Sequence, residues 1–121
     1  EEVTLHVTVY PKENAETVVL LHGGPGVPDP MMAIALGMTQ KYQVINFEQR
    51  GTGESKNPSG DYSIEGYIAD LQAIAKHFGL TRFHIFGHSW GGLYARIYAD
   101  SHPERVQSLF LCSQLWHATP Q

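Results

Sequence analysis

The sequence predicts an α/β fold, in which a mostly parallel β-sheet carries helices on both faces. Two observations support this prediction. Short apolar runs that can form buried strands alternate along the chain with segments whose apolar residues recur at helical spacing. Turn residues, chiefly glycine and proline, separate these segments. Alternating strands and helices are typical of parallel sheets, because a helix connects each strand to the next.

Composition excludes several classes of protein. The chain has 121 residues, which fits one domain, and its 42% hydrophobic and 17% charged residues exclude a disordered chain. A net charge of −4 argues against a nucleic-acid partner. No apolar run approaches the ~20 residues that cross a bilayer, so no membrane association is expected. Cys112 is the single cysteine, which excludes an internal disulfide and suits a reducing compartment, the cytoplasm.

The first half of the chain predicts strands and one helix. Residues 3–10 alternate between apolar and polar, as a half-buried strand does, and Pro11 ends this pattern. Residues 17–21 are a continuous apolar run, typical of a strand that is covered on both faces. A short helix is expected over 31–38 and a further strand over 42–47.

The second half contains the clearest helix. Ser63 is its predicted N-cap, apolar residues follow at 3,4 spacing as far as Phe78, and Gly79 closes it. Three more elements are expected: a strand over 82–86, a helix over 90–101 and a strand over 106–112. In a parallel sheet the carboxyl ends of the strands meet at one edge, where ligands bind in open α/β sheets.

Ser89 lies in a pattern with a chemical meaning at that edge. Gly87-His88-Ser89-Trp90-Gly91 matches G-x-S-x-G, between a predicted strand and a predicted helix. Glycines two before and two after the serine allow a sharp turn without Cβ clashes. The turn lifts the Ser89 hydroxyl off the sheet and sets the Trp90 N–H beside it, where a developing oxyanion can be stabilised.

A second glycine-rich loop follows the strand over 17–21. His22-Gly23-Gly24-Pro25-Gly26 contains tandem glycines, which let a backbone N–H approach a substrate oxygen closely. A plain Gly-Pro turn is the alternative interpretation of this loop. We expect both motifs at the same edge of the sheet.

Together with Phe47–Ser55, these two motifs resemble the α/β-hydrolase superfamily and, within it, the proline iminopeptidase branch. The resemblance runs from about residue 5 to 112 and implies that residues 1–121 form the N-terminal part of an α/β-hydrolase core domain. It implies Ser89 as the nucleophile and an oxyanion hole from the N–H groups of Gly24 and Trp90. The implied activity releases N-terminal residues, often proline, from small peptides or amides.

The chain departs from the family in two respects. Glu48-Gln49-Arg50-Gly51 stands where the family usually has Asp-Gln-Arg-Gly, and we expect Glu48 and Arg50 to brace the loop rather than touch substrate. Members of the family are also considerably longer. Their triad acid and base come after the nucleophile, from later loops, and their helical cap comes later too. The resemblance therefore covers a partial α/β-hydrolase fold, with the later strands and the cap missing.

Residues of this chain are poor substitutes for the missing acid and base. His117 is the histidine that follows a predicted strand at the correct edge, but residues 113–121 contain no Asp or Glu. Asp29 is a remote candidate for the acid, and Cys112 fits a small core residue. We therefore expect a C-terminal half as partner, either a second chain or a continuation that has been removed. Such a segment would also cover the apolar strand over 106–112.

Two other functions remain open at this point. The same fold and serine could serve an esterase or an acyltransferase acting on a small ester or amide substrate, or a carbon–carbon bond hydrolase. A catalytically inactive, truncated binding module is the third hypothesis, because Ser89 without a general base is an ordinary alcohol. No ligand cluster or nucleotide-binding loop is visible, so we expect no metal ion and no organic cofactor.

Overall fold

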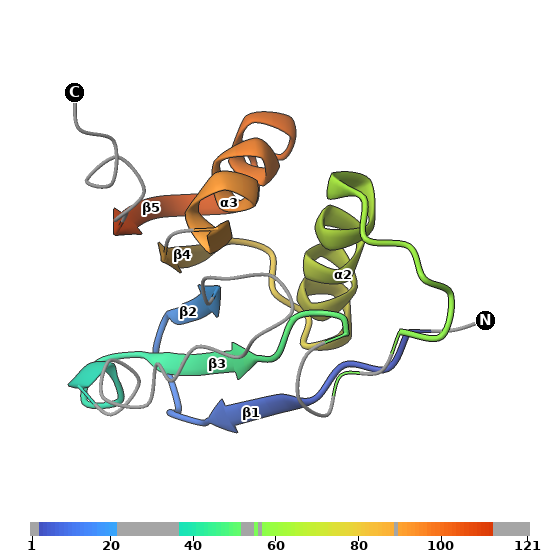
Figure 1. Ribbon diagram of the computed structural model, residues 1–121. Helices are drawn as coiled ribbons and strands as arrows, with labels where there is room; N and C mark the ends of the chain where they lie inside the picture. The colour runs from blue at the N-terminus through green and yellow to red at the C-terminus, as the bar shows by residue number, and fades with distance from the viewer. Residues whose placement is uncertain (1–2, 22–36, 52–54, 56, 89, 113–121) are drawn as a thin grey trace, which may run out of the picture.

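A five-stranded sheet forms the centre of the computed structural model, which describes residues 3–21, 37–51, 55, 57–88 and 90–112. Its strands lie in the order β1-β3-β2-β4-β5 (Figure 1). Only β1 runs antiparallel to its neighbour, so the mostly parallel sheet is confirmed. The strands are β1 (Val7–Tyr10), β2 (Thr17–Leu21), β3 (Gln43–Phe47), β4 (Phe83–His88) and β5 (Val106–Cys112).

Helices α2 (Ile64–His77) and α3 (Trp90–Ser101) pack on the same face of the sheet (Figure 1). Between them and the sheet lies the main core, which includes Val19, Ile45, Phe83, Ile85, Leu71, Tyr94 and Tyr98. A smaller cluster of Val18, Leu20 and Val44 lies on the opposite face, with Met38 packed against it. The helix expected over 31–38 falls outside the described residues, apart from Gly37 and Met38, which are helical.

Three predicted boundaries are corrected by the pairing of the strands. β1 begins at Val7 rather than at residue 3, because its partner β3 ends at Phe47, directly opposite Val7. β3 begins at Gln43 because the N–H of Tyr42 is already bonded to the Met38 carbonyl in a turn. β4 runs from Phe83 to His88, past the predicted end at residue 86, because β5 continues beside it as far as Cys112.

The ends of α2 match the sequence prediction. Ser63 is the N-cap, and its hydroxyl accepts a hydrogen bond from the Gly66 N–H at 3.1 Å. At the other end, Gly79 has a φ of +66° just after the C-cap Phe78, a conformation that glycine adopts without strain. These caps position the helix so that its first turn lies near the loop that follows β3.

Candidate active site

The carboxyl ends of β2, β3, β4 and β5 meet at one edge of the sheet, since these strands are parallel. Leu21, the last residue of β2, lies beside Gly87 in β4. The glycine-rich segment that follows Leu21 therefore starts next to the predicted nucleophile turn. Gly24 and Ser89 themselves lie outside the described residues, and of Trp90 only the backbone is described, as the first residue of α3.

The residues on either side of Ser89 form a tight strand-to-helix turn. β4 ends at His88 and α3 begins at Trp90, so one residue separates the strand from the helix. A Cβ atom on Gly87 would lie 2.8 Å from the Cα of Gly92 and 2.9 Å from the Gly91 carbonyl oxygen. Since no side chain fits there, glycine is required for this close crossing of β4 and α3, as the G-x-S-x-G pattern predicts.

Arg50 braces the loop after β3 from a buried position. Its Nε and Nη2 donate to the two carboxylate oxygens of Asp70 at 2.7 and 2.8 Å, and its Nη1 donates to the Asp61 carbonyl at 2.7 Å. The hydrogen bonds to Asp70 raise the pKa of the Arg50 guanidinium above its usual value. Since Arg50 is directed at these partners, it ties the loop to α2, as expected from the sequence.

The sequence analysis missed Asp70 and Gly66, which both serve Arg50. A Cβ on Gly66 would lie 2.7 Å from Nη1 of Arg50, so the glycine in the first turn of α2 makes room for the guanidinium. Asp70 lies among the buried residues of α2, which also include Tyr67, Leu71 and Ile74. An acidic residue within an apolar helical stripe was the available signal, because a buried carboxylate needs a partner.

Ser55 also holds residues of this loop. It is 1% exposed, its hydroxyl donates to the Glu48 carbonyl at 2.6 Å, and it accepts from the His6 N–H at 2.8 Å. The Ser55 carbonyl accepts from the Gly51 N–H at 2.7 Å. Two polar networks, centred on Arg50 and Ser55, thus hold the described residues of this loop, 48–51 and 55.

Tyr94 connects this region to α3. It is fully buried in the helix that starts at the turn, and the Gln49 side chain lies close to its hydroxyl. Burial raises the pKa of the Tyr94 phenol well above its usual value, and the nearby Asp70 carboxylate adds to this shift. Gln49 and Arg50, neighbours in sequence, therefore reach α3 and α2 respectively.

The raised pKa of Tyr94 predicts that the chain loses stability at alkaline pH. An unfolded tyrosine ionises near pH 10, whereas the folded chain keeps Tyr94 protonated at that pH. The folded state then binds the extra proton, so the free energy of unfolding falls by about 1.4 kcal/mol per pH unit above ~pH 10 for this group. Urea titrations between about pH 9 and 11 should show a shallower decline for Tyr94→Phe. Tyr62→Phe is the control, because Tyr62 is 50% exposed; equal slopes in both variants would contradict the assignment.

Two of the described histidines, His102 and His84, are engaged by residues other than the predicted nucleophile. His102 follows the far end of α3, about 18 Å of helix from the turn, and stacks on Tyr98 with ring centroids 4.5 Å apart. His84 is hydrogen-bonded to Glu16 and Ser108. His117 and Asp29 lie outside the described residues, as does the side chain of Cys112.

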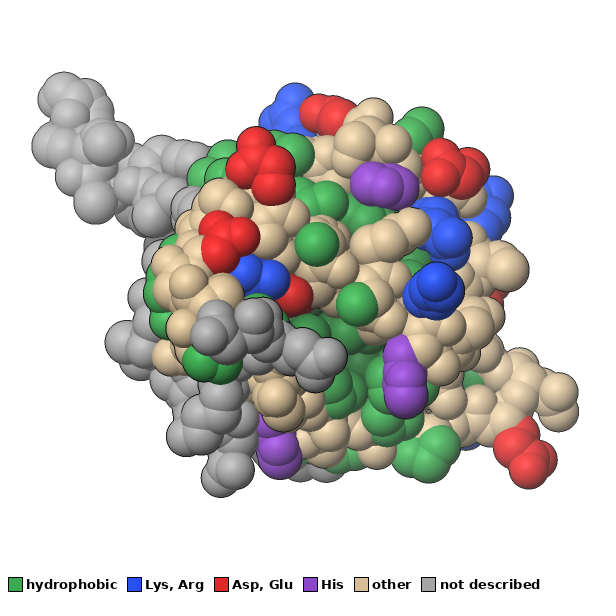
Figure 2. Space-filling model, turned by 90° about the vertical axis from the view of Figure 1, so that its right-hand side faces the viewer, with side chains coloured by type: hydrophobic (Ala, Val, Ile, Leu, Met, Phe, Trp, Pro, Cys, Tyr) green, Lys and Arg blue, Asp and Glu red, His purple; other side chains and the backbone are tan. Residues whose placement is uncertain are grey.

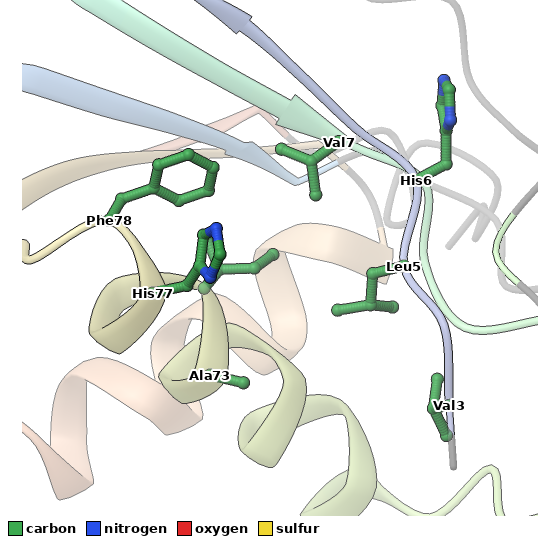
Figure 3. Close-up of a pocket in the computed structure, with 8 residues that line it drawn as sticks. Val3, Leu5, His6, Val7, Ala73, His77 and Phe78 are labelled. Carbon is green, nitrogen blue, oxygen red and sulfur yellow. The ribbon is translucent and has the colours of Figure 1, made fainter.

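A groove of about 570 Å³ lies elsewhere, between the N-terminal segment and α2. Figure 3 shows Leu5 and Val7 turned toward α2, while His6 points away from it. Figure 2 shows hydrophobic side chains in a hollow on this side of the molecule. In the sheet, β3 and β2 separate β1 from β4, so this groove is not part of the site beside Ser89.

The described residues contain no helix that combines the length and hydropathy needed to cross a bilayer. No group of three or more His, Cys, Asp or Glu side chains among them is arranged to hold a metal ion.

The chain belongs to the alpha/beta hydrolase fold family, whose model matches residues 16–121. It is 37% identical over 122 residues to a proline iminopeptidase of Lactobacillus helveticus. The aligned region covers 96% of this chain and 42% of the relative. It is 34% identical to a proline iminopeptidase of Xylella fastidiosa over 81% of this chain and 32% of the relative. The chain thus spans less than half the length of these curated relatives.

Solved structures support the same fold. A marine microorganism esterase is 31% identical with a TM-score of 0.81, over 91% of this chain and 41% of the esterase. A membrane phospholipase A, described as a bacterial virulence factor, is 30% identical with a TM-score of 0.82, over 90% and 36% of the two chains. The described sheet and helices are therefore a partial alpha/beta hydrolase fold.

Proposed function

We propose that this chain is the nucleophile-bearing part of a serine hydrolase of the proline iminopeptidase type. It releases N-terminal residues, often proline, from small peptides or amides through an acyl-enzyme on Ser89. The turn between β4 and α3 is the observation that supports this most directly, with Gly87 packed against Gly91 and Gly92. The likeness to proline iminopeptidases suggests the substrate class.

In this proposal the described backbone prepares the site for an oxyanion. Ser89 attacks the substrate carbonyl, and the negative charge on the oxygen is bound by the N–H groups of Trp90 and Gly24. Trp90 begins α3, whose N-terminus favours negative charge. Leu21 lies beside Gly87, which supports a position for Gly24 close to the turn. The proposed mechanism uses no metal ion and no organic cofactor.

A C-terminal half, as a second chain or a continuation, supplies the acid and the base. The base takes the proton of Ser89 and later gives it to the leaving amine. The same segment covers β5, the last strand of the described sheet, where Phe110 and Leu111 are 55% and 45% exposed. An open apolar edge of this kind otherwise invites aggregation. A cytoplasmic location is part of the proposal and rests on the cysteine content.

Intact-mass spectrometry of the native preparation, with and without a fluorophosphonate probe, tests the proposal. We expect the probe on this chain at Ser89, together with a second polypeptide or a longer chain. Ser89→Ala should abolish the adduct and lower the turnover of a proline arylamide by a factor on the order of 10⁴–10⁶. Ser59→Ala, at an exposed loop position, is the matched control and should leave both unchanged. Absence of an adduct would contradict a working serine hydrolase.

An esterase is the second candidate, favoured by the solved relatives described as an esterase and a phospholipase A. Its chemistry at Ser89 is the same, but the leaving group is an alcohol. Turnover of a simple aryl ester without turnover of N-terminal amino-acid amides would favour this candidate. If neither substrate is turned over and Ser89→Ala keeps the biological effect, the chain is a binding module.

A further inference from the structure

A second serine, Ser108, belongs to a hydrogen-bonded network of three side chains away from the predicted turn. Its Oγ is hydrogen-bonded to Nδ1 of His84, and Nε2 of the same histidine lies 2.7 Å from Oε1 of Glu16. These three residues come from β5, β4 and the segment before β2. A serine, a histidine and a carboxylate are thus aligned in the order that serine hydrolases use.

The three side chains lie on the sheet face opposite α2 and α3. In the register, His84 is flanked by Val18 in β2 and by Ser108 in β5. Val18 belongs to the small cluster on that face, and Phe86, two residues after His84, packs against it. The edge of the Tyr42 ring contacts His84, with centroids 5.5 Å apart. His84 is therefore held in place by packing as well as by hydrogen bonds.

The donors and acceptors among these three side chains determine which ring nitrogen of His84 carries the hydrogen. The hydrogen bond from His84 lowers the pKa of Glu16, so its carboxyl is ionised at neutral pH and can only accept. In neutral His84 the hydrogen must then lie on Nε2, which donates to Glu16. Nδ1 is left as the acceptor, and the Ser108 hydroxyl donates to it. This is the arrangement of a serine with a general base.

Ser101 and His102 make a second serine–histidine contact, in which the donor and acceptor roles are exchanged. Ser101 Oγ lies 2.9 Å from Nδ1 of His102, but its hydroxyl is also 3.1 Å from the carbonyl oxygens of Ile97 and Tyr98. The Ser101 hydrogen is directed at these carbonyls, so His102 donates to the serine. None of the salt bridges among the described residues joins His102 to a carboxylate. Ser101 is therefore an internal control for Ser108.

We propose that Ser108 is a second reactive serine, which small activated acyl esters modify covalently. The Ser108 oxygen bonds to the acyl carbon as its proton passes to Nδ1 of His84. The bond from that carbon to the leaving phenolate then breaks, and the phenolate takes the proton. In this chain without a C-terminal half, Ser108 is half-buried and Phe110, on the same face, is 55% exposed, so a small apolar acyl group has access. The proposal does not depend on the function proposed for Ser89.

Acetylation by 4-nitrophenyl acetate, mapped by peptide mass spectrometry, tests this site. The Ser89→Ala chain is used, so that no adduct comes from the predicted nucleophile. We expect Ser108 to be acetylated at least about tenfold faster than Ser101, since a positioned general base contributes ~10²–10⁴-fold. His84→Gln should reduce the Ser108 rate to that of Ser101, and Glu16→Gln should reduce it in part.

Acetylation of Ser108 no faster than that of Ser101, or unchanged by His84→Gln, would overturn the proposal. A measurement on the unsubstituted chain covers the case in which His84→Gln fails to fold. Long-range ¹H–¹⁵N spectra identify the tautomer of neutral His84, and we expect the hydrogen on Nε2. A hydrogen on Nδ1 would overturn the proposal, because that nitrogen could not accept the serine proton.

Discussion

Asp70→Ala is expected to destabilise the chain by about 3–5 kcal/mol, because it leaves the Arg50 guanidinium buried without its carboxylate. The side chains of Arg50 and Asp70 are only 7% and 9% exposed, and two hydrogen bonds of 2.7 and 2.8 Å join them. The cost arises from the uncompensated charge, since a buried ion pair as a whole adds little compared with apolar residues. The midpoint of urea unfolding, followed by circular dichroism, measures the loss.

Asp61→Ala is the matched control for this prediction. The Asp61 carboxylate lies 3.7 Å from the same guanidinium, but its side chain is 54% exposed. A solvated ion pair of this kind adds little to stability, so Asp61→Ala should cost much less than Asp70→Ala. Its backbone carbonyl, which accepts from Arg50, is kept in the variant. If the two alanine variants lost equal stability, burial of the Arg50–Asp70 pair would not be the reason for either loss.

Local patterns in the sequence predicted the elements well, and the pairing of distant residues poorly. The apolar run Thr17–Leu21 and the capped helix after Ser63 were predictable, because periodicity and caps act over a few residues. The direction of β1 was not, since an alternating strand has the same pattern whether it pairs parallel or antiparallel.

The same reasoning applies to the candidate site. The G-x-S-x-G turn lies within one short segment, so the sequence could indicate it directly. Asp70 and Arg50 are 20 residues apart, and Glu16 and His84 are 68 apart. Such partners become neighbours only when the sheet order is known. Asp70 could have been noticed because it is an acidic residue on an apolar helix face. The sequence around Glu16 and Ser108 contains no such departure from the expected pattern.

Gly87→Ala and Gly92→Ala are expected to change stability in opposite directions, although both add one methyl group near Ser89. At Gly87 the new Cβ would lie 2.8 Å from the Gly92 Cα and 2.9 Å from the Gly91 carbonyl oxygen. Because these are backbone atoms, β4 and α3 must move apart, which costs about 1–3 kcal/mol. At Gly92 the nearest atoms are 3.5 Å away, which is an ordinary contact. Alanine there should stabilise α3 by up to about 1 kcal/mol.

The same pair of variants separates packing from chemistry at the predicted nucleophile. Ser89 lies between the two elements that Gly87→Ala forces apart, and a shift of about 1 Å can cost ~10²-fold in rate. Fluorophosphonate labelling of Ser89 should therefore fall about a hundredfold in Gly87→Ala and stay near the unsubstituted level in Gly92→Ala. Labelling is compared at a temperature where circular dichroism shows both variants folded. Unchanged labelling in a folded Gly87→Ala chain would mean that the close crossing of β4 and α3 does not set the position of Ser89.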